Sequence, residues 1–450
     1  MKRLHIRTND LKEMPKTTAK KQKSAKEKKL SYQSPKGMHD ILPEDQPLWE
    51  KLRQTAKSTA DFYNFSRIDT PIVEVAELFE RSAGVSSDIV EKQMYFVKTK
   101  GGDRLVLRPE ATAPVVRAYF EHGLSRMGQP VKLYYTGPIF RYEQPQSGRY
   151  RQHYQVGFEI LGGENDPIYD AQAILAPYKF LEDVKIKNVM VHINSIGCPK
   201  CRPNYQKKLE AYYKKYQKKI CKDCQRRLAT NSMRLLDCKE EKCQPVKAEA
   251  PVILDYLCES CKNHFKRVLE FLDELKLPYM IDPYLVRGLD YYNRTVFEMF
   301  SEGFNFAIAS GGRYDYLAEM LRLGRLSAVG GSLGLERIVE VLKESGKSAA
   351  LQKYQPKIFF IHIGDEAKKR GLVMLEEFKK SGIKVSESFG KESLKSQLRL
   401  ADKDKAQLAL ILGQKEVFEG SIIIRDMVNG AQETVPLEKV VEEVKRKLHS

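Results

Sequence analysis

The order of strand-like and helical patterns changes along the chain, and this change most constrains what the chain can fold into. A helical pattern at residues 46–63 is followed by strand-like segments at 104–108, 131–139 and 154–161, with further helical patterns at 113–121 and 170–181. Strands and helices that mix without regular βαβ alternation favour an α+β fold with a largely antiparallel sheet. We assign residues 34–345 to this first domain.

The last ninety-odd residues follow a different pattern. Strand-like runs at 357–364, 383–388, 408–413 and 421–427 are accompanied by helical patterns at 367–380, 393–406 and 437–448. Such alternation is typical of an α/β domain with a mostly parallel sheet, which we place at residues 356–450. The polar stretch at residues 344–355 is expected to link the two domains.

All eight cysteines lie within one segment that interrupts the first domain. Residues 197–276 are rich in Lys, Tyr and Cys and show helical patterns, and strand-like sequence resumes after them, so we expect an inserted helical domain. The cysteines come in pairs, three of them Cys-x-x-Cys: Cys198 and Cys201, Cys221 and Cys224, Cys238 and Cys243, Cys258 and Cys261. In a chain expected in the cytoplasm, such pairs predict metal ligands before disulfides, and four thiolates suit a structural zinc ion. Eight thiols could fill two sites, four could fill one, or all could remain free.

Charge and hydropathy restrict the partners and the compartment. The net charge is +18, and residues 1–30 carry eleven Lys or Arg against three acids, so residues 1–33 are expected to form a disordered basic tail. Such a tail either attracts nucleic acid or is simply solvated. No apolar run approaches the roughly 20 residues that span a bilayer, and no secretory signal is evident, so we expect no membrane contact and a cytoplasmic location.

The segment TGPIFRYEQPQSGRYRQHYQVGFEILG, residues 136–162, carries much of the candidate chemistry. Strand geometry places Gln155, Gly157 and Glu159 on one face, and Arg141 leaves the preceding strand beside it. The planar fork of an arginine in that position suits a phosphate, and the polar loop at 143–149 could reach a polar partner. On spacing alone, a charged hairpin within a sheet accounts for the same pattern.

This segment resembles motif 2 of the class II aminoacyl-tRNA synthetases in its histidine-specific form. Further matches to histidyl-tRNA synthetases follow the same order along the chain: residues 37–45, 67–84 (motif 1), 107–119, 285–298, 309–317 and 328–342 (motif 3). The C-terminal domain resembles the anticodon-binding domain of these enzymes, and the insertion resembles the domain that clasps the tRNA acceptor arm. The resemblance therefore covers nearly all of residues 35–450, and the density of cysteines is where the chain departs from the family.

The resemblance implies an amino-acid pocket. Glu110 and Thr112, with Ala111 between them, would hold the amino group of L-histidine, and Gln155 and Glu159 would also face the amino acid. Tyr291 and Tyr292 would line its imidazole ring, and Gly311 and Gly312 would let the backbone approach the ligand closely.

The resemblance also implies an ATP site made of three arginines that carry catalysis. Arg141 and Arg287 would contact the α-phosphate and Arg337 the γ-phosphate. The attacking histidine carboxylate is already an anion, so the site needs alignment and positive charge, supplied by arginines and Mg²⁺, rather than a general base. The expected function is ATP-dependent attachment of histidine to tRNA(His) through a histidyl-adenylate.

Several neighbouring polar residues have simpler explanations. Arg117 and Arg313 are as readily salt-bridged or on the surface as in contact with a ligand. Packing is the expected role of Tyr314 and Tyr316, and a structural role is expected of His39, His153 and His192.

Two further partners follow from the family. Lys395, Arg399 and Lys403 share one face of an expected helix, which suits an RNA backbone or is simply a solvated face. Motif 1 forms a dimer interface in class II enzymes, so we expect a homodimer. The alternatives are a regulatory paralogue that binds histidine and an RNA-sensing module on the same fold. Such a paralogue typically lacks the anticodon domain and several ATP-site arginines, which this chain keeps.

Overall fold

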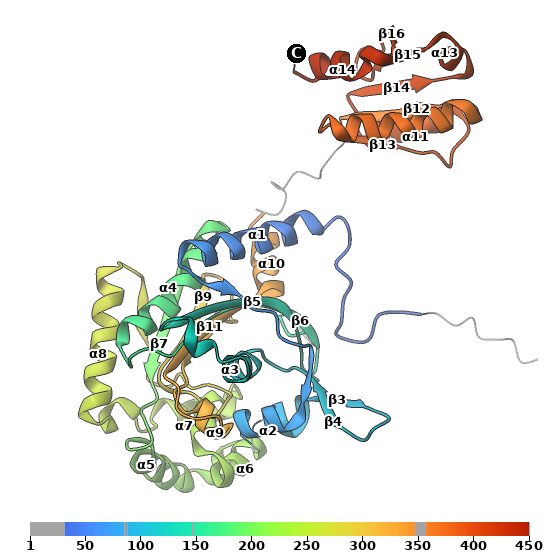
Figure 1. Cartoon of the computed structure of the whole chain (residues 1–450). Helices are drawn as coiled ribbons and strands as arrows, with labels where there is room; N and C mark the ends of the chain where they lie inside the picture. The colour runs from blue at the N-terminus through green and yellow to red at the C-terminus, as the bar shows by residue number, and fades with distance from the viewer. Residues whose placement is uncertain (1–31, 85–86, 88, 146–147, 347–356, 450) are drawn as a thin grey trace, which may run out of the picture. The chain divides into compact units, whose positions relative to one another are not determined.

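The structure, a computed structural model, describes residues 32–84, 87, 89–145, 148–346 and 357–449. Most of the predicted basic tail at residues 1–33 and most of the predicted linker at residues 344–355 lie outside these ranges. Two sheet-containing parts, residues 36–346 and 357–449, are described in turn (Figure 1).

An eight-stranded sheet forms the centre of the first part, in the order β1-β5-β6-β11-β10-β9-β7-β8. Along this order, every pair of neighbouring strands from β5 to β7 is antiparallel. Only the short edge strands β1 and β8 pair in parallel with their neighbours, which confirms the predicted α+β fold with a largely antiparallel sheet. The strands are β1 (Ser66–Arg67), β5 (Val131–Phe140), β6 (Gln152–Leu161), β7 (Val189–Ser195), β8 (Tyr279–Ile281), β9 (Asn293–Ser301), β10 (Ala309–Arg313) and β11 (Ala328–Gly334).

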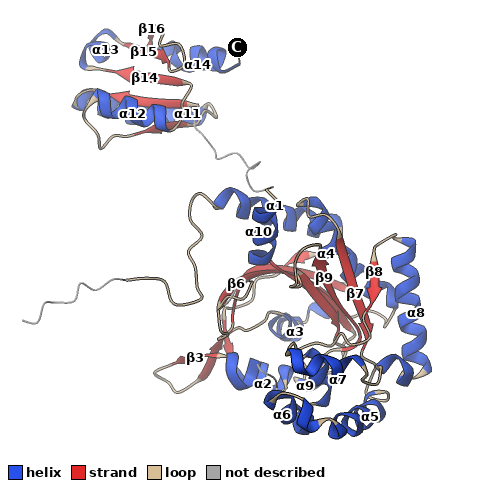
Figure 2. Ribbon diagram, turned by 180° about the vertical axis from the view of Figure 1, so that it is seen from behind, coloured by secondary structure: helices blue, strands red, loops and turns tan. Residues whose placement is uncertain are grey.

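Helices cover both faces of this sheet, as Figures 1 and 2 show from opposite sides. One face packs on α1 (Gln46–Phe62), α4 (Pro167–Asp183) and α10 (Leu335–Glu344), and the sheet curves around α3 (Thr112–Glu121) on the other. The helical spacing predicted for α1 buries Leu48, Leu52, Ala56 and Ala60. A curved sheet with a helix inside it leaves room for a cavity at the ends of its central strands.

A small sheet, β2-β4-β3, lies beside α2 (Ala76–Ala83). Its strands are β2 (Val73–Val75), β3 (Tyr95–Lys98) and β4 (Arg104–Leu107). Val73 and Val75 pair with Leu107 and Leu105, so these apolar side chains share one face. Val75 is 53% exposed although its side chain is apolar.

The cysteine-rich segment is a helical insertion between β7 and β8. Its helices are α5 (Arg202–Lys215), α6 (Lys222–Thr230), α7 (Gln244–Ala248) and α8 (Glu259–Glu274). Because β7 and β8 are paired neighbours, the insertion leaves the sheet and returns to it at adjacent strands.

The C-terminal domain holds a five-stranded sheet in the order β13-β12-β14-β15-β16. Its strands are β12 (Ile358–His362), β13 (Val385–Glu387), β14 (Leu408–Leu412), β15 (Ser421–Asp426) and β16 (Gln432–Pro436), and its helices are α11 (Asp365–Lys380), α12 (Leu394–Lys403), α13 (Gln414–Glu419) and α14 (Val440–His449).

The predicted parallel pairing in this domain holds only for β13, β12 and β14, because β14, β15 and β16 pair antiparallel. Residues 413–420, the connection from β14 to β15, are too few for a parallel crossover, which needs a dozen or more. The strand β16 was not predicted, because its residues are mostly polar and lie at the sheet edge.

A fully buried ion pair joins the sheet to α4. The guanidinium of Arg313, at the end of β10, donates to both carboxylate oxygens of Asp170 on α4 and to Asp315. Arg313 and Asp170 are both 0% exposed. Burial alone would raise the pKa of the Asp170 carboxyl, but Arg313 and His264 lower it below its ordinary value. Arg313 is therefore salt-bridged, in line with one of its two predicted roles.

Replacement of this arginine tests how much the fold depends on the pair. Arg313→Met leaves the Asp170 carboxylate buried without its guanidinium, so the free energy of unfolding should fall by about 3–5 kcal/mol in urea titration. Arg53→Met, which removes an exposed pair with Glu50, is the matched control and should change it by at most about 0.5 kcal/mol. Equal, small effects of the two substitutions would contradict this account.

Candidate active site

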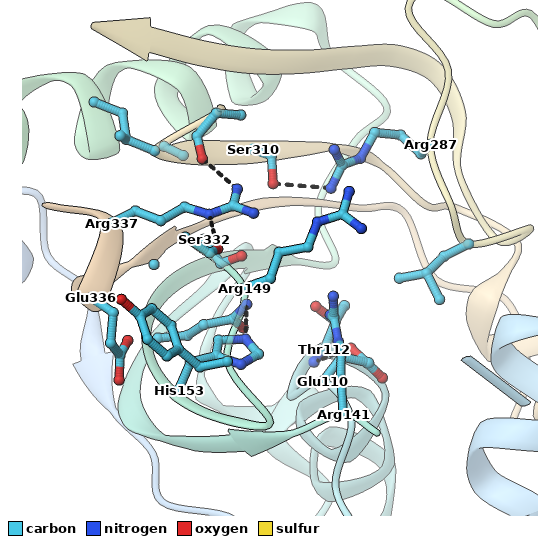
Figure 3. Close-up of a pocket in the computed structure, with 18 of the residues that line it drawn as sticks. Glu110, Thr112, Arg141, Arg149, His153, Arg287, Ser310, Ser332, Glu336 and Arg337 are labelled. Atoms are coloured by element: carbon cyan, nitrogen blue, oxygen red, sulfur yellow. Dashed lines mark hydrogen bonds between the residues drawn. The ribbon is translucent and has the colours of Figure 1, made fainter. Parts of the chain in front are cut away.

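One cavity on the inner side of the curved sheet gathers most of the residues singled out in the sequence. Its lining includes Glu110, Thr112, Arg141, Gln155, Arg287, Tyr291, Tyr292 and Arg337. They come from the start of α3, from β5 and β6, from the loop before β9 and from α10. Figure 3 shows Arg287, Arg337 and Arg149 pointing into the cavity, with Glu110 and Thr112 on another side of it.

Glu110 forms an acidic corner of the cavity at the start of α3. Its carboxylate accepts hydrogen bonds from the backbone N–H groups of Thr112 (2.6 Å) and Ala113 (3.0 Å). Burial raises the pKa of Glu110, and these two N–H groups partly offset the effect. The neighbouring Ala111 is 1% exposed and packs behind this corner rather than lining the cavity.

Glu159 lies behind the acidic corner. One carboxylate oxygen accepts from the Thr112 hydroxyl at 2.8 Å and the other accepts from the hydroxyl of Tyr314. The side chain is 2% exposed, and burial raises its pKa to about 8. Glu159 therefore orients Thr112, and a carboxyl with a pKa of about 8 is mostly protonated at neutral pH.

Three tyrosines make an aromatic wall. The rings of Tyr291 and Tyr292 lie 4.6 Å apart, and Tyr314 meets both edge-on at 5.8 and 6.4 Å. Burial raises the pKa of each phenol, so each hydroxyl stays protonated and can donate a hydrogen bond. Tyr314, expected to serve packing, packs here and also donates to Glu159.

Two of the lining arginines, Arg141 and Arg337, are held by backbone carbonyls through part of the guanidinium. Arg141 donates from Nε to the Pro109 carbonyl at 2.8 Å. Arg337 donates to the carbonyls of Gly148 (2.8 Å) and Ala307 (2.6 Å). A guanidinium has five N–H donors in a rigid fork, so anchoring one edge orients the remainder.

Arg287 is anchored from two sides. It pairs with Glu298 on β9, donates to the Ser310 hydroxyl at 2.9 Å on β10, and lies 5.4 Å above the Tyr292 ring. The guanidinium of Arg287 is thus held against the aromatic wall by contacts with two neighbouring strands.

Sequence reasoning missed several lining residues: Arg149, Tyr150, Ser310, Ser332 and Glu336. The polar loop at 143–149 was the signal for Arg149, but its composition could not tell which side chain turns inward. His153, expected to be structural, also lines the cavity, and burial together with Arg141 and Arg337 lowers its pKa to about 3. His153 is therefore neutral near pH 7.

Gly311 and Gly312 lie at contacts between strands and do not line the cavity. A Cβ on Gly311 would stand 2.2 Å from the Gly330 carbonyl oxygen, and one on Gly312 would stand 2.5 Å from that of Thr295. The close approach that these glycines permit is therefore between β10 and its neighbouring strands.

The eight cysteines meet in two groups of four, although no disulfide joins them. The junction tetrad consists of Cys198, Cys201, Cys258 and Cys261, and the inner tetrad consists of Cys221, Cys224, Cys238 and Cys243. Neighbouring sulfurs lie 3.6 and 3.9 Å apart in the first and 3.9 and 4.0 Å apart in the second. A tetrahedral site with zinc–sulfur bonds of about 2.3 Å would place its sulfurs about 3.8 Å apart.

Backbone groups around both tetrads point at sulfur. The N–H of Cys258 donates to the sulfur of Cys201 at 3.1 Å, and the N–H of Cys221 donates to that of Cys243 at 3.2 Å. Donation to sulfur favours the thiolate, which is the form that binds metal. Both tetrads therefore fit a zinc ion in their donor set and spacing.

Comparisons with known proteins agree with this geometry. Residues 37–338 match a family model described as histidyl-tRNA synthetase, and residues 357–447 match one described as an anticodon-binding domain. A histidine–tRNA ligase of Dehalococcoides mccartyi is 45% identical over 93% of this chain and 100% of its own length. One from Syntrophotalea carbinolica is 41% identical over 91% of this chain and 97% of its own length.

A solved structure agrees as well. The apo histidyl-tRNA synthetase of S. aureus superimposes with a TM-score of 0.75 at 33% identity and covers 92% of this chain and 100% of its own. Within the described residues, no helix combines the length and the apolar character that crossing a membrane requires. The match of family, domains and fold over nearly the whole chain confirms the family expected from the sequence: the chain belongs to the histidyl-tRNA synthetases.

Proposed function

We propose that this protein activates L-histidine with ATP and transfers it to tRNA(His) through a histidyl-adenylate. The observation that carries the proposal is that an acidic corner, an aromatic wall and four arginines converge on one cavity. A cationic ammonium group, an imidazole ring and a polyphosphate need these three surroundings within reach of one another.

The amino-acid end of the cavity selects histidine. Glu110, the Thr112 hydroxyl and Gln155 bind the ammonium group, and Glu159 supports Thr112 from behind. Tyr291 and Tyr292 line the imidazole side with protonated hydroxyls. An amino acid without ring nitrogens leaves such buried polar groups unpaired, which is the strongest available basis for rejecting it.

The arginine end binds ATP and carries the chemistry. Arg141 and Arg287 contact the α-phosphate, Arg337 contacts the γ-phosphate, and Arg149 adds charge between them. The histidine carboxylate attacks the α-phosphorus in line, an O–P bond forms and the bond to pyrophosphate breaks. Guanidinium groups that are already in place stabilise the negative charge that develops on the phosphate oxygens, and they need not rearrange to do so.

Magnesium fits the same end of the cavity. It prefers oxygen ligands, and Glu143, which lines the cavity 3.9 Å from Arg149, offers a carboxylate beside the phosphates. The ion supplies charge neutralisation at the departing pyrophosphate.

The C-terminal domain binds the anticodon region of tRNA(His). The attachment of histidine to this tRNA takes place in the cytoplasm. Lys395, Arg399 and Lys403 on α12 are all exposed, and their i, i+4 spacing presents a stripe of cations to an RNA backbone. A regulatory paralogue is disfavoured, because residues 357–447 match an anticodon-binding domain and Arg141, Arg287 and Arg337 all line the cavity.

The active form is a homodimer joined through motif 1. The apolar face of the β2-β4-β3 sheet, formed by Val73, Val75, Leu105 and Leu107, is partly exposed in the single chain. A second copy that covers this face removes it from water and explains why apolar residues occupy it.

The two tetrads hold structural zinc. Four thiolates with this spacing close a tetrahedral coordination sphere and leave no position for a substrate, so the metal serves folding rather than chemistry.

Histidine-dependent exchange of pyrophosphate into ATP tests the activation step. The protein should catalyse exchange with histidine and not with phenylalanine. Arg287→Gln should lower its kcat by about 10²–10³-fold, because a donor at the reacting phosphate is lost. Arg53→Gln, on the exposed side of α1, is the control and should retain full exchange. Exchange that is absent in folded protein would reject the proposal.

Proton release on histidine binding tests the amino-acid pocket. The carboxyl of Glu159 is protonated below a pKa of about 8, and the bound ammonium group should lower that pKa, so binding near pH 7 should release a proton. Calorimetry in buffers of different ionisation enthalpy measures the release, which should vanish well above pH 8. Glu159→Gln should abolish it, whereas the exposed Glu182→Gln should leave it unchanged. Release that persists in Glu159→Gln would assign the proton elsewhere.

Sedimentation velocity tests the dimer. The wild-type protein should sediment as a dimer at micromolar concentration, and Val75→Glu should shift it to monomer by placing a charge in the apolar face. Val428→Glu, at a valine that is 89% exposed in the C-terminal domain, should leave the dimer intact. A wild-type monomer at this concentration would contradict the assignment of the β2-β4-β3 face.

Metal analysis tests the tetrads. Protein purified without added metal should contain two zinc ions per chain, one for each group of four cysteines. A zinc content close to zero would show that the thiols are free.

A further inference from the structure

The insertion that contains both tetrads contacts an irregular segment that carries three residues of the candidate active site. Residues 286–292, here called the specificity loop, include Arg287, Tyr291 and Tyr292, and β9 begins directly after them at Asn293. A loop is a poor support for groups that must be placed to within about 0.5 Å, unless neighbouring structure fixes it. Beside the contacts of Arg287 with Glu298 and Ser310, the insertion supplies further contacts to this loop.

The junction tetrad holds the end of the loop that bears Tyr292. Arg202 follows Cys201 directly, and its guanidinium donates to the carbonyl of Tyr292 and, at 3.1 Å, to that of Ile196. The backbone N–H of Arg294 donates to the Gly197 carbonyl at 2.8 Å, and the carbonyl of Arg294 accepts from Ile196 at 2.7 Å. Each contact lies within two or three residues of Cys198 or Cys201.

The other half of the junction tetrad holds the same end from α8. The guanidinium of Arg294 donates to the hydroxyl of Ser260 at 3.4 Å and lies 3.3 Å from Nδ1 of His264. Arg294 has a φ of 52°, a left-handed conformation that costs energy in a residue with a side chain. Surroundings that include both halves of the junction tetrad therefore maintain this conformation.

The segment that belongs to the inner tetrad contacts the earlier part of the loop, from Gly288, which follows Arg287 directly, to Asp290. The segment between Cys224 and Cys238 carries Asn231, whose side chain donates to the Asp290 carboxylate at 2.9 Å. Arg234, in the same segment, donates to the carbonyl of Gly288 at 3.1 Å.

We propose that each tetrad positions one end of the specificity loop, the junction tetrad placing Tyr292 for the amino acid and the inner tetrad placing Arg287 for ATP. The proposal rests on the zinc sites and on the histidine and ATP sites of the proposed function. A zinc ion in the junction tetrad would link Cys201 to Cys258 across 57 residues of sequence, so its loss would remove the cross-link between the two segments that contact Tyr292 and Arg294. Arg202 and Arg294 then make their contacts with segments that are no longer cross-linked to each other.

Four variants separate these roles. Cys201→Ser and Cys224→Ser should each lower the zinc content from two ions per chain to one. Cys201→Ser should raise the KM for histidine at least about tenfold with a smaller change for ATP, and Cys224→Ser should do the reverse. Arg202→Gln and Asn231→Ala should keep both zinc ions and reproduce the respective KM changes, because they remove the contact and not the metal. Arg53→Gln should change neither zinc nor KM.

Hydrogen–deuterium exchange of the specificity loop gives a readout that needs no activity. Cys201→Ser should speed exchange at residues 291–294, and Cys224→Ser should speed it at residues 287–290. Two zinc ions with this pattern in a protein that lacks histidine activation would uphold the positioning role and reject the proposed function. Equal loosening of the whole loop by both cysteine variants, or unchanged exchange after zinc loss, would overturn the positioning role.

Discussion

The buried pair of Arg313 and Asp170 is the interaction on which the rest of the catalytic domain depends. A charge that is removed from water must be paired, so the position of α4 on the sheet and the end of β10 are fixed together. The next residue, Tyr314, donates to Glu159, and Glu159 accepts from Thr112 at the cavity wall. A series of polar contacts thus runs from the buried ion pair to the acidic corner of the cavity.

The same pair connects the core with the cysteine-rich insertion. His264 on α8 lies 3.3 Å from the Asp170 carboxylate, and α8 begins at the junction tetrad. The cavity is therefore supported in two ways. Arg141, Gln155 and Glu159 stand on or beside long antiparallel strands, where the ladder holds them, whereas Arg287 and Tyr292 stand on a loop that depends on the insertion. This difference explains why a domain outside the sheet carries contacts to the active site.

Much of the architecture followed from local pattern. The spacing of Leu48, Leu52 and Ala56 predicted α1, and mixing of strands and helices predicted the antiparallel sheet, because periodicity reports which face of an element is buried. The antiparallel pairing of β14, β15 and β16 did not follow from local pattern, since the reversal of direction after β14 depends on the short connection from β14 to β15. The family signature pointed to most of the residues that line the cavity. Ala111 and Glu159 lie behind them, and Gly311 and Gly312 stand at contacts between strands.

The cysteines mark the limit of local reasoning. Spacing along the chain identifies four pairs, yet it cannot tell that the first pair meets the last, because that depends on the return of α8 to β8. The burial of Glu159 and the inward turn of Arg149 likewise arise from contacts between distant segments. The lowered pKa of His153 depends first on burial and then on Arg141 and Arg337, which lie on other elements.

Charging of tRNA transcripts tests most directly whether these parts form one working site. Purified protein, histidine and ATP are mixed with a tRNA(His) transcript, and aminoacylated and free RNA are separated on an acidic gel. The account predicts that tRNA(His) becomes charged at its 3′ end and that a tRNA of another specificity does not. Adenylate formation without transfer to tRNA(His), or equal charging of both RNAs, would contradict it.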